Sequence, residues 1–574
     1  MDIKLHHNTL KMLLRIFDSE TSTIPCIQTP PQKASVPIEE SSFTLLKRAK
    51  PEDMNIPSSY LCAMLKELTS CNDVNLQQLL LVKDGTVIYD ASFGAYSFGI
   101  WRATHSLCKS VTSLAIGMLT DEGRLSIDDD LVSIFSGELS SFAQMTHKKT
   151  RVRHLLSMSV GSTFNEASIV ASSDWFNGWF DSPVRFESGS QFYYNSINSY
   201  ILSAIVRKIT GQNLSEYLKP RLFDVLGITR YHWETCPKGI EKGGFGLYLS
   251  AEDMAKLGVL VCQNGRWNGK QVVSEKWIND ATRAHISVPL SVGDYDYGYH
   301  MWCHRKNGSV LFNGMFGQNV FIYPDKDIVA VTLCGNDEVF QQSSLYSIIN
   351  KYFSDLYPEK DVFRTSSFIP YRRLLSFAKK SAPKLSSLPA QCSQLCGKRI
   401  AFTDAKSAGI LPVIVQIVQN NYTHGITSVS FNIDGDDFYV NITEGVATKR
   451  IPVGFSKGKI TELDLGGESY VISTVGSFSA DEDGNLVLKL RISFLELPNE
   501  RIIRFYFDKN DVTMKMDEVP GVDFLWNLVH SAASEHSKAP ISVLFSRLSD
   551  KIDSDYLQYR AEKLFSPDLK GFYK

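Results

Sequence analysis

Strand patterns near residue 80 and again near residue 320 enclose a long helical stretch, and this arrangement restricts the fold of the first 360 residues. Residues 79–82 and 86–89 are apolar runs joined by Asp84-Gly85, which predicts a β-hairpin. A second group of strands is expected at 310–312, 318–323 and 328–333. We therefore predict an α+β domain in which a hairpin and returning strands share one antiparallel sheet.

Helical spacing fills much of the stretch between these strands. Apolar residues recur every three to four positions from residue 107 to residue 119, and Gly123 stands where a helix of this length would end. Three further runs with helical spacing occupy 152–158, 199–209 and 253–263. The helices are therefore expected to form a subdomain inserted between the two groups of strands.

The composition changes beyond residue 360. Residues 379–384, Lys-Lys-Ser-Ala-Pro-Lys, are typical of a linker, and short strands with Asp-Gly turns follow. In residues 486–494 apolar side chains alternate with Lys, Arg and Ser, which indicates a half-buried antiparallel strand. A small β-sandwich or barrel is expected here. The aspartate-rich stretches 434–436 and 481–484 fit turns better than calcium loops, because no EF-hand spacing follows them.

The length of the chain, 574 residues, suffices for two or three hydrophobic cores. The predicted segments are an N-terminal segment and linker at 1–40, a main domain at 41–360, a linker at 361–389, a β-rich accessory domain at 390–520 and a helical tail at 521–574.

Charge and apolar patterning argue against several kinds of partner. The formal net charge is −2 and 43% of the residues are hydrophobic, which is typical of a globular protein and gives no electrostatic basis for binding nucleic acid. No apolar run is long enough for a signal-peptide core or a membrane span, so we expect a cytoplasmic protein.

The ten cysteines are scattered, and Cys392 and Cys396 lack a second pair at zinc spacing. We expect neither a metal nor an organic cofactor.

Ser106 and Lys109 are separated by one helical turn at the start of the first helical run. An amine in this position can take the serine proton if burial suppresses its charge, which would make Ser106 an acylatable nucleophile. The same Ser-x-x-Lys spacing recurs at 376–379, 381–384 and 456–459, so the tetrapeptide alone proves nothing. The surrounding motifs have to distinguish Ser106 from these other serines.

A series of motifs follows Ser106 in a fixed order. They are Arg-His-Leu-Leu-Ser-Met-Ser-Val-Gly at 153–161, Tyr194-x-Ser196, Gly-Gly-Phe-Gly-Leu at 243–247, Ser-Ala-Glu-Asp-Met-Ala at 250–255 and Phe-Asn-Gly at 312–314. In this order they resemble the serine β-lactamase and penicillin-binding superfamily, in its class C-related branch with esterases, D-amino-acid peptidases and amide hydrolases. The resemblance covers roughly residues 75 to 350 and implies a β-lactamase-like fold.

The resemblance implies roles for three catalytic groups. Ser106 would be the nucleophile, Lys109 its proton acceptor, and Tyr194 would pass a proton between Ser106 and the leaving group. Tyr193 competes with Tyr194 as a core aromatic, but only Tyr194 stands two residues before Ser196. The backbone N–H groups of Ser106 and Met315 would stabilise the oxyanion, with Met315 following Gly314 of the third motif.

Substrate-binding roles are less specific. Ser196 would orient Lys109 or contact a substrate carbonyl, or make a structural hydrogen bond. Asn313 and Gln318 could line the acyl pocket or simply pack within strands. Trp175, with Trp179, lies where family members place substrate contacts, although a core role is equally consistent with the sequence.

Two departures from the family pattern restrict the function. Phe312 stands where β-lactamases have the lysine of the third motif, and Ser196 stands where class C enzymes have asparagine. We therefore expect a serine hydrolase acting on a small-molecule or short-peptide ester or amide, rather than an efficient β-lactamase. An acyltransferase using the same acyl-enzyme and a non-catalytic ligand-binding module remain as alternatives. His105 as the base of a triad is a further alternative, but no acidic partner is indicated. The oligomeric state is left open.

Overall fold

The computed structural model describes most of the chain in two compact units. The described residues are 45–97, 99–162, 166–170, 172–355, 369–378, 387–403, 408–521 and 562–574, together with Lys33, Tyr357, Asp523 and Tyr559. Among the described residues, one unit lies within Pro37–Lys379, and the other comprises Lys33 and residues within Lys380–Lys574. Most of the predicted N-terminal segment and of the predicted linker at 361–389 lies outside the described residues.

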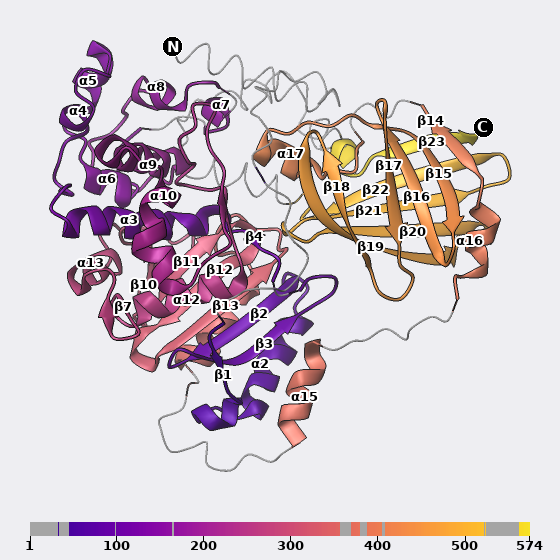
Figure 1. Ribbon diagram of the computed structural model, residues 1–574, viewed down its shortest axis with the longest axis horizontal. Helices are drawn as coiled ribbons and strands as arrows, with labels where there is room; N and C mark the ends of the chain where they lie inside the picture. The colour runs from indigo at the N-terminus through magenta and orange to yellow at the C-terminus, as the bar shows by residue number, and fades with distance from the viewer. Residues whose placement is uncertain are drawn as a thin grey trace. The chain divides into compact units, whose positions relative to one another are not determined.

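The first unit contains an eight-stranded sheet in the order β1-β3-β2-β13-β12-β11-β10-β9 (Figure 1). The strands are β1 Lys47–Arg48, β2 Leu76–Lys83, β3 Thr86–Ser92, β9 Tyr295–Tyr297, β10 Trp302–His304, β11 Val310–Gly314, β12 Gln318–Tyr323 and β13 Ile328–Cys334. All neighbours are antiparallel except β1 and β3, which are parallel. The predicted hairpin is β2–β3, and the returning strand β13 pairs with β2, which confirms the expected shared sheet.

Helices make up most of the rest of this unit, as the sequence predicted. They are α2 Ser58–Ser70, α3 Cys108–Asp121, α4 Leu131–Ile134, α5 Ser141–His147, α6 Val152–Leu156, α7 Glu166–Val170, α8 Trp175–Phe180, α9 Ser196–Thr210, α10 Leu214–Leu218, α11 Asp224–Leu226, α12 Ala251–Cys262, α13 Glu275–Ala281, α14 Ser344–Asn350 and α15 Ile369–Ala378. Short strands accompany them: β4 Arg102–Ala103, β5 His232–Trp233, β6 Leu247–Leu249, β7 Arg266–Trp267 and β8 Lys270–Gln271. The four helical runs predicted from spacing correspond to α3, α6, α9 and α12.

Both faces of the eight-stranded sheet are buried. Along β13, Val329 belongs to one apolar core and its neighbour Ala330 to the other. Helix α12 packs against the first face, and Gly258 permits the close approach, since a Cβ there would stand 2.6 Å from a Val320 methyl group. Side chains of α2, α14 and α15 contribute to the second core. A strand buried on both faces loses the alternation of polar and apolar residues, which explains the continuous apolar runs in the sequence.

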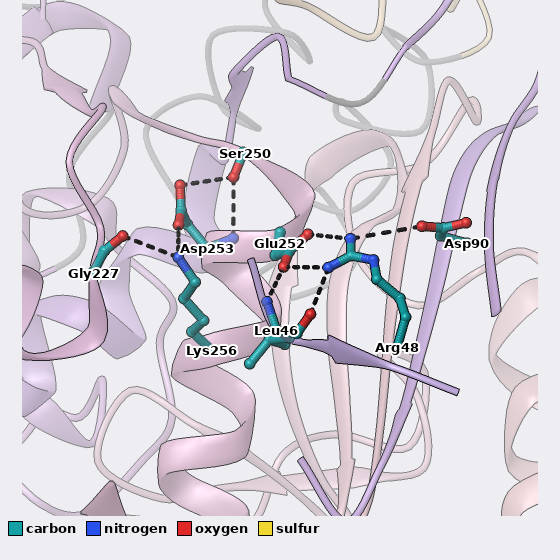
Figure 2. A network of polar contacts seen from close by, with 8 residues as sticks. All are labelled: Leu46, Arg48, Asp90, Gly227, Ser250, Glu252, Asp253 and Lys256. Carbon is teal, nitrogen blue, oxygen red and sulfur yellow. Dashed lines mark hydrogen bonds and ion pairs between the residues drawn. The ribbon is translucent and has the colours of Figure 1, made fainter. Parts of the chain in front are cut away.

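The N-terminus of α12 is held by a polar network that also reaches strand β1 (Figure 2). Ser250 caps the helix: its Oγ accepts from the Asp253 N–H at 3.1 Å and donates to the Asp253 carboxylate at 2.7 Å. Asp253 also forms a buried ion pair with Lys256 at 2.7 Å. Next to the cap, Glu252 pairs with the guanidinium group of Arg48 on β1. The Ser-Ala-Glu-Asp motif is therefore a helix start that attaches α12 to the edge strand.

The second unit is a ten-stranded antiparallel sheet in the order β17-β16-β15-β14-β23-β22-β21-β20-β19-β18 (Figure 1). Its strands are β14 Arg399–Phe402, β15 Ile426–Asp434, β16 Asp437–Glu444, β17 Ala447–Val453, β18 Lys459–Leu465, β19 Glu468–Ala480, β20 Leu486–Phe494, β21 Glu500–Phe507, β22 Asp511–Val519 and β23 Asp568–Tyr573. Gly454, directly after β17, donates to the Thr474 carbonyl at 3.1 Å and accepts from the Gly476 N–H at 2.8 Å, both on β19. The two ends of the sheet therefore approach each other, and the predicted β-rich domain is a nearly closed barrel.

Two short helices accompany the barrel strands, α16 Ala390–Leu395 and α17 Val413–Gln419. The first N–H groups of α17, from Val413 and Ile414, donate to the Glu518 carboxylate at 2.8 and 3.2 Å. Arg501 donates to the same carboxylate at 2.9 Å, and neither side chain of this ion pair is exposed. The aspartate-rich stretches form the turns of hairpins β15–β16 and β19–β20, as predicted.

The prediction of a helical tail is wrong at its end. Residues Asp568–Tyr573 form β23, which pairs with β14 and β22 inside the barrel. The partners of β23 are more than 160 residues away in β14 and more than 50 residues away in β22, so local sequence could not establish either pairing. Among the described helices, none combines the length and the apolar character that crossing a membrane requires.

Candidate active site

Ser106 lies in a tight turn that leads directly into α3. A single 3-10 turn, His105–Leu107, precedes the helix, and Thr104 fixes it by donating from both N and Oγ1 to the Leu247 carbonyl of β6 at 2.8 Å. His105 adopts φ 48°, a left-handed conformation that is uncommon outside glycine. The turn directs the backbone into α3, whose first residues are buried. Ser106 is thus presented at the start of a helix enclosed by the core.

The His105 side chain gives no support to a Ser-His triad. Its ring packs edge-to-face on Phe316 at 5.2 Å, and its Nε2 is buried without a hydrogen-bond partner among the described residues. Burial lowers the pKa of His105 to about 4, so the ring is neutral at pH 7. A triad base would need an acidic group on one ring nitrogen and the serine on the other.

Lys109 reaches back to Ser106 within one turn of α3. Its Nζ lies 2.8 Å from Ser106 Oγ, 3.2 Å from Ser196 Oγ and 2.7 Å from the Gly244 carbonyl oxygen. Only 1% of the lysine is exposed. Three neighbours match the three donors of an ammonium group, so the buried nitrogen has a partner for every proton.

The second motif is brought to Lys109 by the start of α9. Ser196 is the first residue of that helix, and the Asn195 side chain caps it by accepting from the Ile197 N–H at 2.9 Å. The Tyr194 ring lies with its centroid 4.8 Å from Lys109 Nζ, a cation–π arrangement. The structure therefore brings Ser106, Lys109, Tyr194 and Ser196 together, as the sequence predicted.

Aromatic packing keeps the Tyr194 ring in place. The ring stacks on Trp302 at 6.0 Å and meets Phe340 edge-to-face at 5.2 Å. Tyr193, the competing residue, donates its backbone N–H to the Met158 carbonyl at 2.7 Å. A proton-transfer role for Tyr194 rather than Tyr193 stays a prediction, and the contacts show that the Tyr194 ring is held beside Lys109 Nζ.

Gly243 and Gly244 allow the turn that contains them to lie directly on α9. A Cβ at Gly244 would stand 2.3 Å from the Ser196 carbonyl oxygen, and a Cβ at Gly243 would stand 2.4 Å from that of Ser199. Only glycine fits at this distance, and the contact brings the Gly244 carbonyl to Lys109. The Gly-Gly motif therefore supplies a hydrogen-bond acceptor to the Lys109 nitrogen.

The third motif runs along the turn that holds Ser106. A Cβ at Gly314, the last residue of β11, would stand 2.3 Å from the Thr104 carbonyl oxygen. Phe316, two residues later, packs on His105. Met315 therefore passes beside Ser106, where its backbone N–H is predicted to serve as an oxyanion donor together with that of Ser106.

Three predicted binding residues have structural contacts instead. Asn313 donates to Asn319 Oδ1 at 2.8 Å and to the Tyr346 hydroxyl at 3.0 Å, and Gln318 donates to the Cys334 carbonyl at 2.6 Å. Trp175 is 2% exposed and packs in the core. Substrate-lining roles for these three side chains are not supported. Both faces of the sheet are covered, so polarity in β11 and β12 marks internal hydrogen bonds rather than a pocket.

Trp179 and Phe312 are also core residues. The Trp179 indole N–H donates to Asn198 Oδ1 at 3.0 Å, and neither Trp179 nor Phe312 has exposed surface. At Phe312, where the family pattern has a lysine, the structure therefore places an apolar ring inside the core and no cation.

Glu166 is a site residue that the sequence analysis did not single out. Its Oε1 accepts the Ser196 backbone N–H, and burial raises the pKa of the Glu166 carboxyl while the nearby Lys109 charge opposes that rise. Glu166 begins α7, thirty residues before Ser196, in a stretch without recognisable spacing. No sequence signal connects it to the motifs.

Comparison with known proteins covers the same part of the chain. A family model described as "Beta-lactamase" matches residues 77–341, which include Ser106, Lys109, Glu166, Tyr194 and Ser196. A curated relative, the 6-aminohexanoate-dimer hydrolase of Paenarthrobacter ureafaciens, is 26% identical over 256 residues, which are 40% of this chain and 64% of the relative. The chain thus spans slightly less than two thirds of that relative's length.

Solved structures give a similar result. An octameric penicillin-binding protein homologue from Pyrococcus abyssi is 18% identical with a TM-score of 0.42, over 81% of this chain and 98% of the other. A D-stereospecific amidohydrolase from Streptomyces sp. is 12% identical with a TM-score of 0.42, over 52% of this chain and 99% of the other.

Proposed function

We propose that residues 77–341, which match the family model described as "Beta-lactamase", form a serine hydrolase that cleaves an ester or amide bond through an acyl-enzyme on Ser106. The observation that carries the proposal is the 2.8 Å contact between Lys109 Nζ and Ser106 Oγ, with the lysine buried between α9 and Gly244. A nucleophilic serine needs a base within hydrogen-bond reach, and a buried amine satisfies that requirement.

The reaction follows from these positions. Ser106 Oγ attacks the substrate carbonyl carbon and its proton passes to Lys109 Nζ, while the N–H groups of Ser106 and Met315 stabilise the negative oxygen. The proton then reaches the leaving alcohol or amine, with the Tyr194 hydroxyl as its carrier. Water attacks the acyl-enzyme, the same groups accept its proton, and Ser106 is regenerated.

The site favours a substrate whose acyl part needs no carboxylate. Phe312 occupies the position at which β-lactamases present a lysine, and its ring is buried in the core. The relative named for hydrolysing a 6-aminohexanoate dimer supports an amide or ester of a small linear acid as the substrate class. Efficient turnover of β-lactams is not expected.

The proposal is tested by intact-protein mass spectrometry after incubation with a fluorophosphonate. One adduct on the wild type is expected, absent in Ser106→Ala and formed slowly in Lys109→Ala. Ser456→Ala and Lys459→Ala are matched controls, because they have the same spacing in the barrel and Lys459 is half-exposed beside Asp437. Folded wild-type protein without an adduct would overturn the hydrolase proposal and favour a ligand-binding module.

A further inference from the structure

We propose that Glu166 is a positioning residue of this site, which takes up the proton that Lys109 must release before it can act on Ser106, with the Ser196 hydroxyl as the link between them. The inference rests on the proposed hydrolase function and adds a fourth group to it.

A continuous chain of polar contacts connects the four residues. Lys109 Nζ contacts Ser106 Oγ at 2.8 Å on one side and Ser196 Oγ at 3.2 Å on the other. The Ser196 backbone N–H donates to Glu166 Oε1, which brings the carboxyl group to Ser196, and hydrogen bonding from the Ser196 side chain opposes the rise in the pKa of that carboxyl. A hydroxyl accepts one hydrogen bond while donating another, so Ser196 can relay a proton between an amine and a carboxylate.

The neighbours of Lys109 Nζ can hydrogen-bond the nitrogen both as a charged ammonium group and as a neutral amine. As an ammonium group it donates to Ser106 Oγ, Ser196 Oγ and the Gly244 carbonyl. As an amine it donates to Ser196 and Gly244 and accepts from the Ser106 hydroxyl. In either form each proton or lone pair of the Lys109 nitrogen has a partner within hydrogen-bond distance.

Burial and the charge on Lys109 act on the Glu166 carboxyl in opposite directions. A buried ion pair loses much of its Coulomb energy to desolvation, whereas the neutral amine and carboxylic acid do not. For Glu166, burial favours the protonated form, whereas the nearby Lys109 charge and hydrogen bonding from Ser196 favour the ionised form. The carboxyl is therefore suited to gain and lose a proton within the catalytic cycle.

The proton transfer conserves every proton. An N–H bond of the Lys109 ammonium breaks as its proton joins Ser196 Oγ, while the O–H bond of Ser196 breaks and that proton joins a Glu166 oxygen. Lys109 is then a neutral amine, Glu166 a neutral acid and Ser196 unchanged. Rotation of the amine about its Cε–Nζ bond then turns the lone pair from Ser196 to Ser106, and it accepts the Ser106 proton as Oγ attacks the carbonyl carbon, which restores the ammonium group.

The relay predicts a specific dependence of acylation on pH. With one proton on the Lys109–Glu166 pair, the relay can free the amine; with two protons it cannot. Wild-type acylation should therefore decline only as pH falls through the pKa of Glu166. In Glu166→Gln the amine is freed only by losing its proton to solvent, so the acid limb of the profile moves to higher pH.

The test measures the rate of fluorophosphonate adduct formation between pH 5 and pH 10. At pH 7 we expect Glu166→Gln to react about 100-fold more slowly than wild type, the scale of a lost acid–base partner, and to approach the wild-type rate as pH rises. Ser196→Ala should show the same shifted profile, and the double variant should be no slower than either single one. Glu166→Asp, which keeps a carboxylate, should retain the wild-type shape of the profile.

Two controls separate the possible outcomes. Glu187→Gln removes an exposed glutamate that pairs with Lys149 at the surface, and it should behave as wild type. A rate lowered by the same factor at every pH in Glu166→Gln, or an unchanged rate, would overturn the relay while the wild-type adduct still supports the hydrolase. Absence of an adduct on wild type would overturn both proposals.

Discussion

Replacing Gly244 by alanine tests how closely the Lys109 site depends on backbone contact. A Cβ at this position would stand 2.3 Å from the Ser196 carbonyl oxygen and 3.1 Å from its carbonyl carbon. A carbon and an oxygen in contact are normally separated by about 3.3 Å, so one backbone must retreat by about 1 Å. Both atoms belong to backbone, and no flexible side chain can give way.

The retreat affects both stability and catalysis. Overpacking of this kind costs about 1–3 kcal/mol of unfolding free energy. In the wild type the Gly244 carbonyl oxygen lies 2.7 Å from Lys109 Nζ. A shift of about 1 Å would break that hydrogen bond and leave the buried nitrogen without one of its partners. A misplacement of about 1 Å in a catalytic group costs on the order of 100-fold in rate.

The assay compares fluorophosphonate labelling and thermal unfolding of Gly244→Ala with those of Gly178→Ala. Gly178 lies inside α8, where an added Cβ would meet only Ile169 at an ordinary 3.4 Å. Alanine should be neutral or stabilising there, with wild-type labelling. If Gly244→Ala also labels at the wild-type rate and unfolds at the wild-type temperature, the contact between Gly244 and α9 does not position Lys109 and the reasoning fails.

Three further perturbations test other parts of the structure. Gly317→Ala, at φ 80° with Cys334 Cβ 2.8 Å from the added carbon, should slow labelling about tenfold by displacing Met315, whereas Gly94→Ala, with a similar φ and no contact, should not. Arg501→Met should lower the unfolding free energy of the barrel by about 3–5 kcal/mol in a denaturant titration, and adding Glu518→Leu should recover part of it. Burial raises the pKa of Glu444 to about 7 from 4.5, so its stabilising proton is fully bound below pH 4.5 and lost as pH rises through 7. Relative to Glu444→Gln, wild type should lose about 3 kcal/mol of unfolding free energy over that range, and a constant difference would contradict this.

Local patterns carried most of the fold prediction. The hairpin β2–β3 could be found because Asp84 and Gly85 both adopt positive φ, which an Asp-Gly pair tolerates and most residues do not. The helices α3, α9 and α12 followed from apolar spacing. These patterns involve residues only a few positions apart, so they can be recognised without knowledge of the tertiary structure.

Nonlocal contacts explain the errors. Gly571 looks like a strand breaker in the sequence, yet it lies in β23, where a Cβ would meet the Phe402 ring at 2.7 Å. Glycine is needed at this position because the Phe402 ring, on the distant strand β14, occupies the space that a side chain would take. For Asn313 and Gln318 the sequence left a pocket role and strand packing both open for a related reason, because their internal partners, Asn319 and the Cys334 carbonyl, are not visible in the sequence.

The same principle decides which Ser-x-x-Lys can be catalytic. At 456–459 the lysine is 46% exposed and pairs with Asp437, so its ammonium group stays solvated and has no reason to release a proton. Lys109 has the same spacing from its serine, but Gly244, at a sequence separation of 135, and Ser196, at a separation of 87, enclose its nitrogen. The Ser-x-x-Lys spacing by itself only places the lysine side chain within one helical turn of the serine. The capacity for acylation comes from the glycine pair and α9, whose contacts remove water from the amine and replace it with partners that accept either protonation state.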